Sequence, residues 1–141
     1  MDNFRPVIKR LFTIAILMGS LLAVMPVRAQ AIINNRDCTA DQMTCQAKVR
    51  DTTAQMNMMP DGKNFRRVVI FSEDMKRDKE DFLIMVGGLM MIINPHSTAD
   101  ERGDLMMSLL SNGRKTVRWS GFAWQLGYSD TDAIRLVAER L

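Results

Sequence analysis

Few residues of this chain could carry out chemistry, and histidine is the scarcest of them. His96 is the only histidine. A single histidine cannot build a histidine-based metal cluster, and most catalytic triads also depend on one. The chain contains no Gly-x-Ser-x-Gly or Ser-x-x-Lys motif, and no glycine pattern typical of a phosphate or dinucleotide site. Because His96 follows Pro95 shortly before an expected helix, we expect an exposed turn residue.

Carboxylates are plentiful, and a pair of them could support hydrolysis. The densest group lies before a long apolar run and consists of Asp74, Asp78, Glu80 and Asp81. This pattern is typical of the solvated first turns of a helix. The sequence does not decide whether the protein is an enzyme. It favours a non-catalytic role, because every catalytic signal is weak.

The two cysteines, Cys38 and Cys45, lie close together in the sequence. In an oxidising compartment two such cysteines usually pair, so we predict a Cys38–Cys45 disulfide. A redox-active pair is the alternative, but the Cys-x-x-Cys motif is missing.

Methionine is unusually frequent, with 13 residues in the chain. Met56, Met58 and Met59 form a cluster that resembles the Met-x-Met clusters of periplasmic copper-binding proteins. The resemblance implies Cu(I) as a ligand, because soft thioethers suit this ion. Most other methionines occupy positions where they would fill a helical core, as Met85 and Met90 do. The favoured interpretation therefore has no cofactor, with Cu(I) as the alternative.

Four aromatic residues within a short stretch form the candidate binding site: Trp119, Phe122, Trp124 and Tyr128. Tryptophan and tyrosine are enriched at interface hot spots. Aromatic side chains also dominate protein cores, so all four could instead pack beneath the helices. We expect Trp119 or Tyr128, at the ends of the strands, to belong to the binding surface.

Residues 1–31 match the three-part pattern of a cleaved signal peptide. A basic start (Arg5, Lys9 and Arg10) precedes an apolar run, and Ala29 and Ala31 offer small residues at cleavage spacing. An uncleaved membrane anchor is the alternative, although the run is short for a span. We therefore expect a periplasmic or secreted protein with no stable membrane span after cleavage.

Removal of this segment changes the charge of the protein. The chain has 19 Lys and Arg against 16 Asp and Glu, and residues 1–31 hold four of the basic and one of the acidic residues. Residues 32–141 therefore carry 15 of each, which leaves no net charge. No overall basic character remains to support nucleic-acid binding.

The central apolar stretch, residues 82–93, could form either a helix or a hairpin that turns at Gly87 and Gly88. Its Leu and Met content favours the helix. A second helix is expected to begin with a capping box at Thr98 and Glu101 and to end at Asn112 and Gly113.

Strands are predicted on both sides of these helices. Residues 53–59 and 64–71 should form a hairpin around Pro60, Asp61 and Gly62. Residues 116–119 and 122–128 flank a tight turn or bulge, and residues 133–138 fit a strand slightly better than a helix. The predicted fold is a single α+β domain over residues 32–141, with a small antiparallel sheet of about four strands and a helical hairpin packed on one face.

These observations favour an exported, non-catalytic binding module of the bacterial cell envelope, whose partner is another envelope or secreted protein. The alternative is a periplasmic Cu(I)-binding protein that uses Met56, Met58 and Met59. A small hydrolase with carboxylate chemistry comes third.

Overall fold

The computed structural model describes residues 32–33, 36–49, 51–62, 64–111, 113 and 115–141. The predicted signal peptide, residues 1–31, lies outside this part of the chain, as does Asn112 of the predicted helix end.

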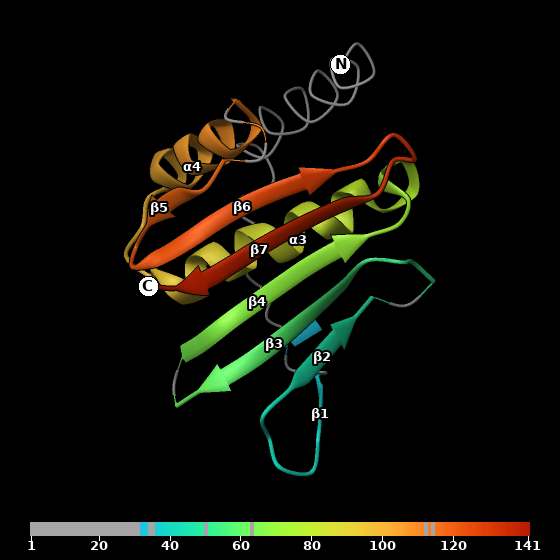
Figure 1. Ribbon diagram of the computed structural model, residues 1–141, viewed down its shortest axis with the longest axis vertical. Coiled ribbons are helices and arrows are strands. Elements are labelled where there is room, and N and C mark those ends of the chain that lie inside the picture. The colour runs from blue at the N-terminus through green and yellow to red at the C-terminus, as the bar shows by residue number, and fades with distance from the viewer. Residues whose placement is uncertain (1–31, 34–35, 50, 63, 112, 114) are drawn as a thin grey trace.

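Within the described residues, seven strands form one antiparallel sheet, in the order β1-β2-β3-β4-β7-β6-β5 (Figure 1). The strands are β1 (Asp37–Cys38), β2 (Cys45–Lys48), β3 (Gln55–Asp61), β4 (Asn64–Ser72), β5 (Val117–Trp119), β6 (Phe122–Tyr128) and β7 (Ile134–Arg140). The predicted sheet of about four strands is therefore wrong.

The strands that the sequence did not indicate are β1 and β2. β1 and β2 are two and four residues long, too short to show a clear alternation of apolar and polar residues. β7 joins the two halves of the sheet, because it pairs with β4 on one side and with β6 on the other. Residues 134–138 thus belong to a strand, as favoured from the sequence, and of the predicted segment 133–138 Ala133 lies outside it.

Two helices of the described chain connect β4 to β5: α3 (Met75–Ile93) and α4 (Ala99–Ser111). Residues 82–93 are helical, so the helix prediction is confirmed over the hairpin. α3 lies behind the sheet in Figure 1, against β4, and α4 contacts β5 and β6 at the other end. Neither described helix has the combination of length and apolar character needed to cross a membrane.

Local sequence signals explain the ends of both helices. The Asp74 carboxylate caps α3 by accepting hydrogen bonds from the backbone N–H groups of Lys76 and Arg77, at 3.1 and 3.4 Å. The predicted capping box of α4 is confirmed, because Thr98 Oγ1 accepts from the N–H of Glu101 while the Glu101 carboxylate accepts from the N–H of Thr98.

Two turns set the register of the hairpins. Gly62 has a φ of +63° in the β3–β4 turn. The predicted hairpin is confirmed, but Pro60 and Asp61 belong to β3 and pair with β4, so they are not part of the turn. Ser120 and Gly121 have φ values of 51° and 79° and form a two-residue turn, which places Trp119 opposite Phe122. The feature at Gly121 is a tight turn rather than a bulge.

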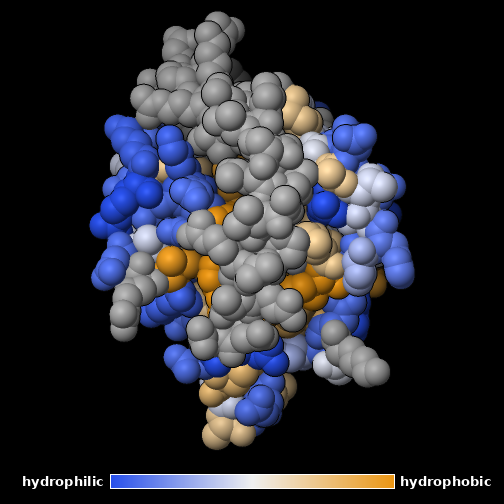
Figure 2. Space-filling model, turned by 180° about the vertical axis from the view of Figure 1, so that it is seen from behind, coloured by the Kyte–Doolittle hydropathy of each residue, from blue (hydrophilic) through white to orange (hydrophobic). Residues whose placement is uncertain are grey.

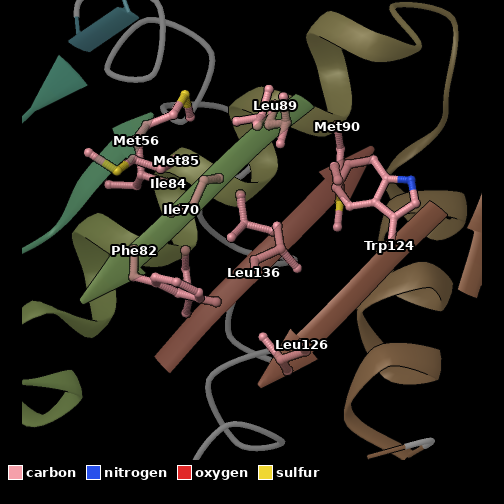
Figure 3. Close-up of a cluster of buried hydrophobic side chains, with 14 of the residues drawn as sticks. Met56, Ile70, Phe82, Ile84, Met85, Leu89, Met90, Trp124, Leu126 and Leu136 are labelled. Atoms are coloured by element: carbon pink, nitrogen blue, oxygen red, sulfur yellow. The ribbon is translucent and has the colours of Figure 1, made fainter. Parts of the chain in front are cut away.

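The core lies between the sheet and the helices (Figure 3). Every residue of α3 from Phe82 to Met90 is buried, including Gly87 and Gly88. Alternate residues of the strands meet this helix, among them Ile70, Leu126 and Leu136. Seen from the helix side, hydrophilic side chains dominate the margins of the molecule, and hydrophobic ones gather towards its middle (Figure 2).

The opposite face of the sheet is not crossed by either described helix (Figure 1), and we call it the open face. It consists of the strand positions that alternate with the buried ones: Asp37, Gln46, Lys48, Gln55, Asn57, Met59, Arg67, Val69, Phe71, Arg118, Ala123, Gln125, Gly127, Arg135, Val137 and Glu139.

Candidate functional site

The four aromatic residues proposed for binding lie on the helix-facing side of β5 and β6. Phe122 and Trp124 are 2% and 0% exposed, whereas Trp119 and Tyr128 are half-buried at the strand ends. Trp119 and Trp124 meet edge to face, with ring centroids 5.8 Å apart, and Trp124 Nε1 donates a hydrogen bond to the Trp119 carbonyl. The structure thus brings Trp119 and Trp124 together, with Phe122 and Trp124 in the core and Trp119 and Tyr128 at its border.

The three methionines proposed for copper do not share an exposed surface. Met56 and Met58 are 1% and 0% exposed and point into the core, whereas Met59 is half-buried on the open face. This alternation follows from their position in β3, where successive side chains point to opposite faces. Core packing therefore accounts for Met56 and Met58. His96 is exposed, as expected.

Cys38 and Cys45 form the predicted disulfide between directly opposed positions of β1 and β2. The bond is consistent with an exported protein. It closes a short loop next to the edge of the sheet.

Replacing Cys38 and Cys45 with serine is expected to lower the free energy of unfolding by about 2–3 kcal/mol, because the short loop gains entropy mainly in the unfolded chain. Urea unfolding of the oxidised protein and of the double variant measures this difference. Reduction of the wild type should reproduce it, and no change on reduction would contradict the expectation.

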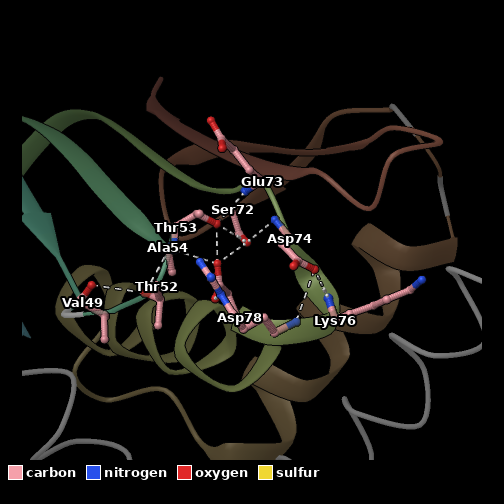
Figure 4. A network of polar contacts seen from close by, with 10 residues as sticks. Val49, Thr52, Thr53, Ala54, Ser72, Glu73, Asp74, Lys76 and Asp78 are labelled. Carbon is pink, nitrogen blue, oxygen red and sulfur yellow. Dashed lines mark hydrogen bonds and ion pairs between the residues drawn. The ribbon is translucent and has the colours of Figure 1, made fainter.

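A buried carboxylate, Asp78, connects the start of α3 to the sheet (Figure 4). Its Oδ2 accepts hydrogen bonds from Thr53 N at 2.8 Å, from the Thr53 hydroxyl, and from Ser72 Oγ at 3.1 Å. Its Oδ1 accepts from Arg77 Nε at 3.1 Å. Three segments meet here: the β2–β3 loop, the end of β4 and the first turn of α3. The interpretation of Asp78 as a solvated residue was wrong.

Asp78 is held in its charged form. Burial opposes its ionisation, but hydrogen bonds from Thr53, Arg77 and Ser72 together outweigh burial and lower the pKa of this carboxyl below its ordinary value. A carboxylate with a lowered pKa is a weak base near neutral pH, so this arrangement suits structural support better than proton transfer.

The lowered pKa predicts acid-dependent stability. Asp78 stabilises the fold fully above its unfolded-state pKa of about 3.9, and the contribution is lost as the pH falls through the lower pKa of the folded state. The stability difference between the wild type and Asp78→Asn should therefore be largest at neutral pH and shrink in acid. Urea unfolding across a pH series tests this, and a difference independent of pH would refute it.

A surface cavity of about 290 Å³ lies beside this network, at the end of the open face. Its lining consists of Lys48, Thr52, Thr53, Ala54, Gln55, Phe71 and Glu73. Lys48, Gln55 and Phe71 are neighbours across three strands of the open face. The cavity thus combines one cation, one anion, hydroxyl groups and an aromatic ring, a mixture suited to holding a side chain or a small polar group.

Thr53 links the cavity to the buried network. Its hydroxyl donates to Asp78 and accepts a hydrogen bond from the Glu73 N–H at 3.0 Å. These bonds fix the orientation of the hydroxyl and leave it poorly placed to act as a nucleophile. Among the described residues, no three His, Cys, Asp or Glu side chains group closely enough to hold a metal ion.

Comparison of the chain with protein-family models, with curated proteins and with solved structures finds no match.

Proposed function

We propose that this chain is an exported, non-catalytic module of the bacterial cell envelope, periplasmic or secreted, that binds another envelope or secreted protein. The proposal depends on one observation: the described helices cover one face of the sheet, and the open face presents side chains from all seven strands. Such a face offers a broad, preorganised surface whose side chains are held by a rigid scaffold.

The anatomy of the open face supports binding. Its middle is apolar and half-buried, at Val69, Phe71 and Val137, and its margins are polar. Protein interfaces share this arrangement of an apolar centre and a polar rim. The cavity beside Phe71 adds a place where one partner side chain could be enclosed. Trp119 and Tyr128, half-buried on the other side of the sheet, are a second candidate surface.

The chemistry of the described residues supports a non-catalytic role. Asp78, a buried carboxylate with a lowered pKa, connects the sheet to α3, and Thr53 belongs to the same hydrogen-bond network. The disulfide and the signal-peptide pattern of residues 1–31 support export.

Two measurements on protein from the host test the proposal. Mass spectrometry of the periplasmic or secreted fraction should show a chain that begins after Ala29 or Ala31. Size-exclusion chromatography of the same fraction should show the chain in a complex larger than the purified protein. A full-length chain in the membrane fraction would overturn the export part, and elution only as the free chain would overturn the binding part.

A further inference from the structure

Three half-buried apolar side chains form the centre of the open face: Val69, Phe71 and Val137. None of them belongs to the core or to the partly buried side chains that pack against it. They lie on β4 and β7, which are neighbours in the middle of the sheet, and Val69 and Val137 are directly opposed (Figure 1). Apolar surface of this kind favours an occupant that removes it from water.

A pair of opposite charges borders this centre on one side. Arg67 and Glu139 are directly opposed across β4 and β7, and each lies two residues from a central valine. No ion pair of the described residues joins Arg67 to Glu139, and the Nε of Arg67 is buried without a hydrogen-bond partner. Both charges are therefore placed to meet a charge of an occupant.

Opposite charges also border the centre on its other side. Arg135 is directly opposed to Phe71, and Glu73 follows two residues after Phe71. The two middle strands and the residue after β4 thus carry two cations and two anions around the apolar centre. The remaining charged residues of the open face lie on outer strands: Asp37, Lys48 and Arg118. Charge around the centre is balanced, so it selects neither an acidic nor a basic occupant.

The order of these side chains makes the surface its own complement. Consider a twofold axis that runs along the strands between β4 and β7 and relates two copies whose open faces meet. β4 of each copy then faces β7 of the other, so residues opposed within one sheet are also opposed across the interface. The pairs that face each other are Arg67 with Glu139, Val69 with Val137, and Phe71 with Arg135.

Each of these contacts is favourable. The axis repeats the contact of Arg67 with Glu139, so the interface holds two such ion pairs. Arg135 of one copy lies over the ring of Phe71 of the other, a cation–π arrangement, with the carboxylate of Glu73 nearby. Packed sheets differ by about 30° in strand direction, which displaces the pairs least close to the axis. A second copy therefore matches both the apolar centre and the charges around it.

We propose that two copies of this chain form a homodimer through the open face, with β4 of each copy packed on β7 of the other. The dimer encloses Val69 and Val137, and Arg67 of one copy pairs with Glu139 of the other. This inference goes beyond the proposed function, because an envelope protein that binds the open face must displace the second copy.

Sedimentation velocity of the purified mature chain over a range of concentrations tests the dimer. The wild type should shift from monomer to dimer as its concentration rises. Added salt should weaken the dimer, because it screens the ion pairs at the border of the interface.

Two single charge reversals test the predicted pairing. Arg67→Glu and Glu139→Arg each bring like charges together across the twofold axis, so each alone should raise the dimer Kd by about tenfold or more. An equimolar mixture of the two variants should dimerise again, because every cation at these positions then faces an anion of the other copy. A mixture that stays monomeric would overturn the inference.

A matched pair of reversals on the helices controls for net charge. Lys79→Glu and Asp100→Arg are exposed on α3 and α4 and change the net charge by the same amounts. Each alone should change the dimer Kd by less than about twofold. If these variants weaken the dimer as strongly as the reversals on the open face, association depends on net charge alone and the proposed interface is wrong.

Circular dichroism and thermal unfolding of each variant verify folding. If a reversal unfolds the chain, Arg67→Gln and Glu139→Gln replace the two variants; each removes the ion pair and should weaken the dimer, and an unchanged Kd in both would overturn the inference. A wild-type chain that remains monomeric at about 1 mM would also overturn it. If the purified chain is monomeric but elutes in a larger complex from the host fraction, the inference fails and the proposed function stands.

Discussion

Replacing Trp124 with alanine is expected to lower the free energy of unfolding by about 3–5 kcal/mol. Trp124 is fully buried, belongs to the cluster of Figure 3 and packs edge to face against Trp119. The change would leave a large cavity and remove the hydrogen bond from Nε1 to the Trp119 carbonyl. Urea or thermal unfolding, with circular dichroism as the signal, measures the loss.

Two further variants serve as controls for Trp124. Trp124→Phe keeps a large aromatic ring but loses the hydrogen bond, so it should lower the free energy of unfolding by less than the alanine variant does. Trp119→Ala should also cost less than Trp124→Ala, because Trp119 is half-buried. If Trp124→Ala unfolds with nearly wild-type stability, the described packing of β6 is incorrect.

Replacing Asp78 with alanine is expected to lower the free energy of unfolding by about 3 kcal/mol, because it leaves several donors without an acceptor and each costs about 1–3 kcal/mol when buried. The donors are the backbone N–H and hydroxyl of Thr53 and the hydroxyl of Ser72. The loss should be accompanied by faster hydrogen exchange in the β2–β3 loop, since Asp78 connects that loop to α3.

Asp78→Asn and Arg77→Ala provide the comparison. Asparagine retains one acceptor oxygen, so the free energy of unfolding of Asp78→Asn should lie between those of the wild type and the alanine variant. Arg77 contacts Asp78 through a partly exposed side chain, and its removal should cost only about 0–1 kcal/mol. Equal losses in Asp78→Ala and Arg77→Ala would show that the ion pair, rather than the hydrogen bonds of Thr53 and Ser72, provides the stabilisation.

Local signals in the sequence predicted most elements of this fold. The capping box of Thr98 and Glu101, the turn glycine Gly62 and the helix-forming residues of 82–93 each depend on neighbours within a few positions. The size of the sheet did not follow from such signals, because β1 and β2 are short and the pairing of β7 with β4 joins segments distant in the sequence.

The role of Asp78 could have been inferred from helical periodicity. Residues 78, 82, 85 and 89 fall on one face of α3, so Asp78 shares the face of Phe82, Met85 and Leu89. Its position in a charged stretch obscured this pattern. The partners Thr53 and Ser72 come from other segments and could not have been identified without the fold.

The candidate surface illustrates the same limit. The aromatic residues Trp119 and Tyr128 are prominent in the sequence, but the fold places them on the helix-facing side. The open face consists of residues from separate strands, such as Lys48 and Arg135, whose common placement depends on the sheet order.

Site-specific photo-crosslinking in the living host tests the central claim most directly. A photoreactive amino acid is introduced separately at Val137 on the open face, at Tyr128 on the helix-facing side and at Lys79 on the exposed surface of α3. The account predicts a discrete protein adduct from position 137 that position 79 does not give. An adduct from position 128 or 79 with none from position 137 would contradict the account.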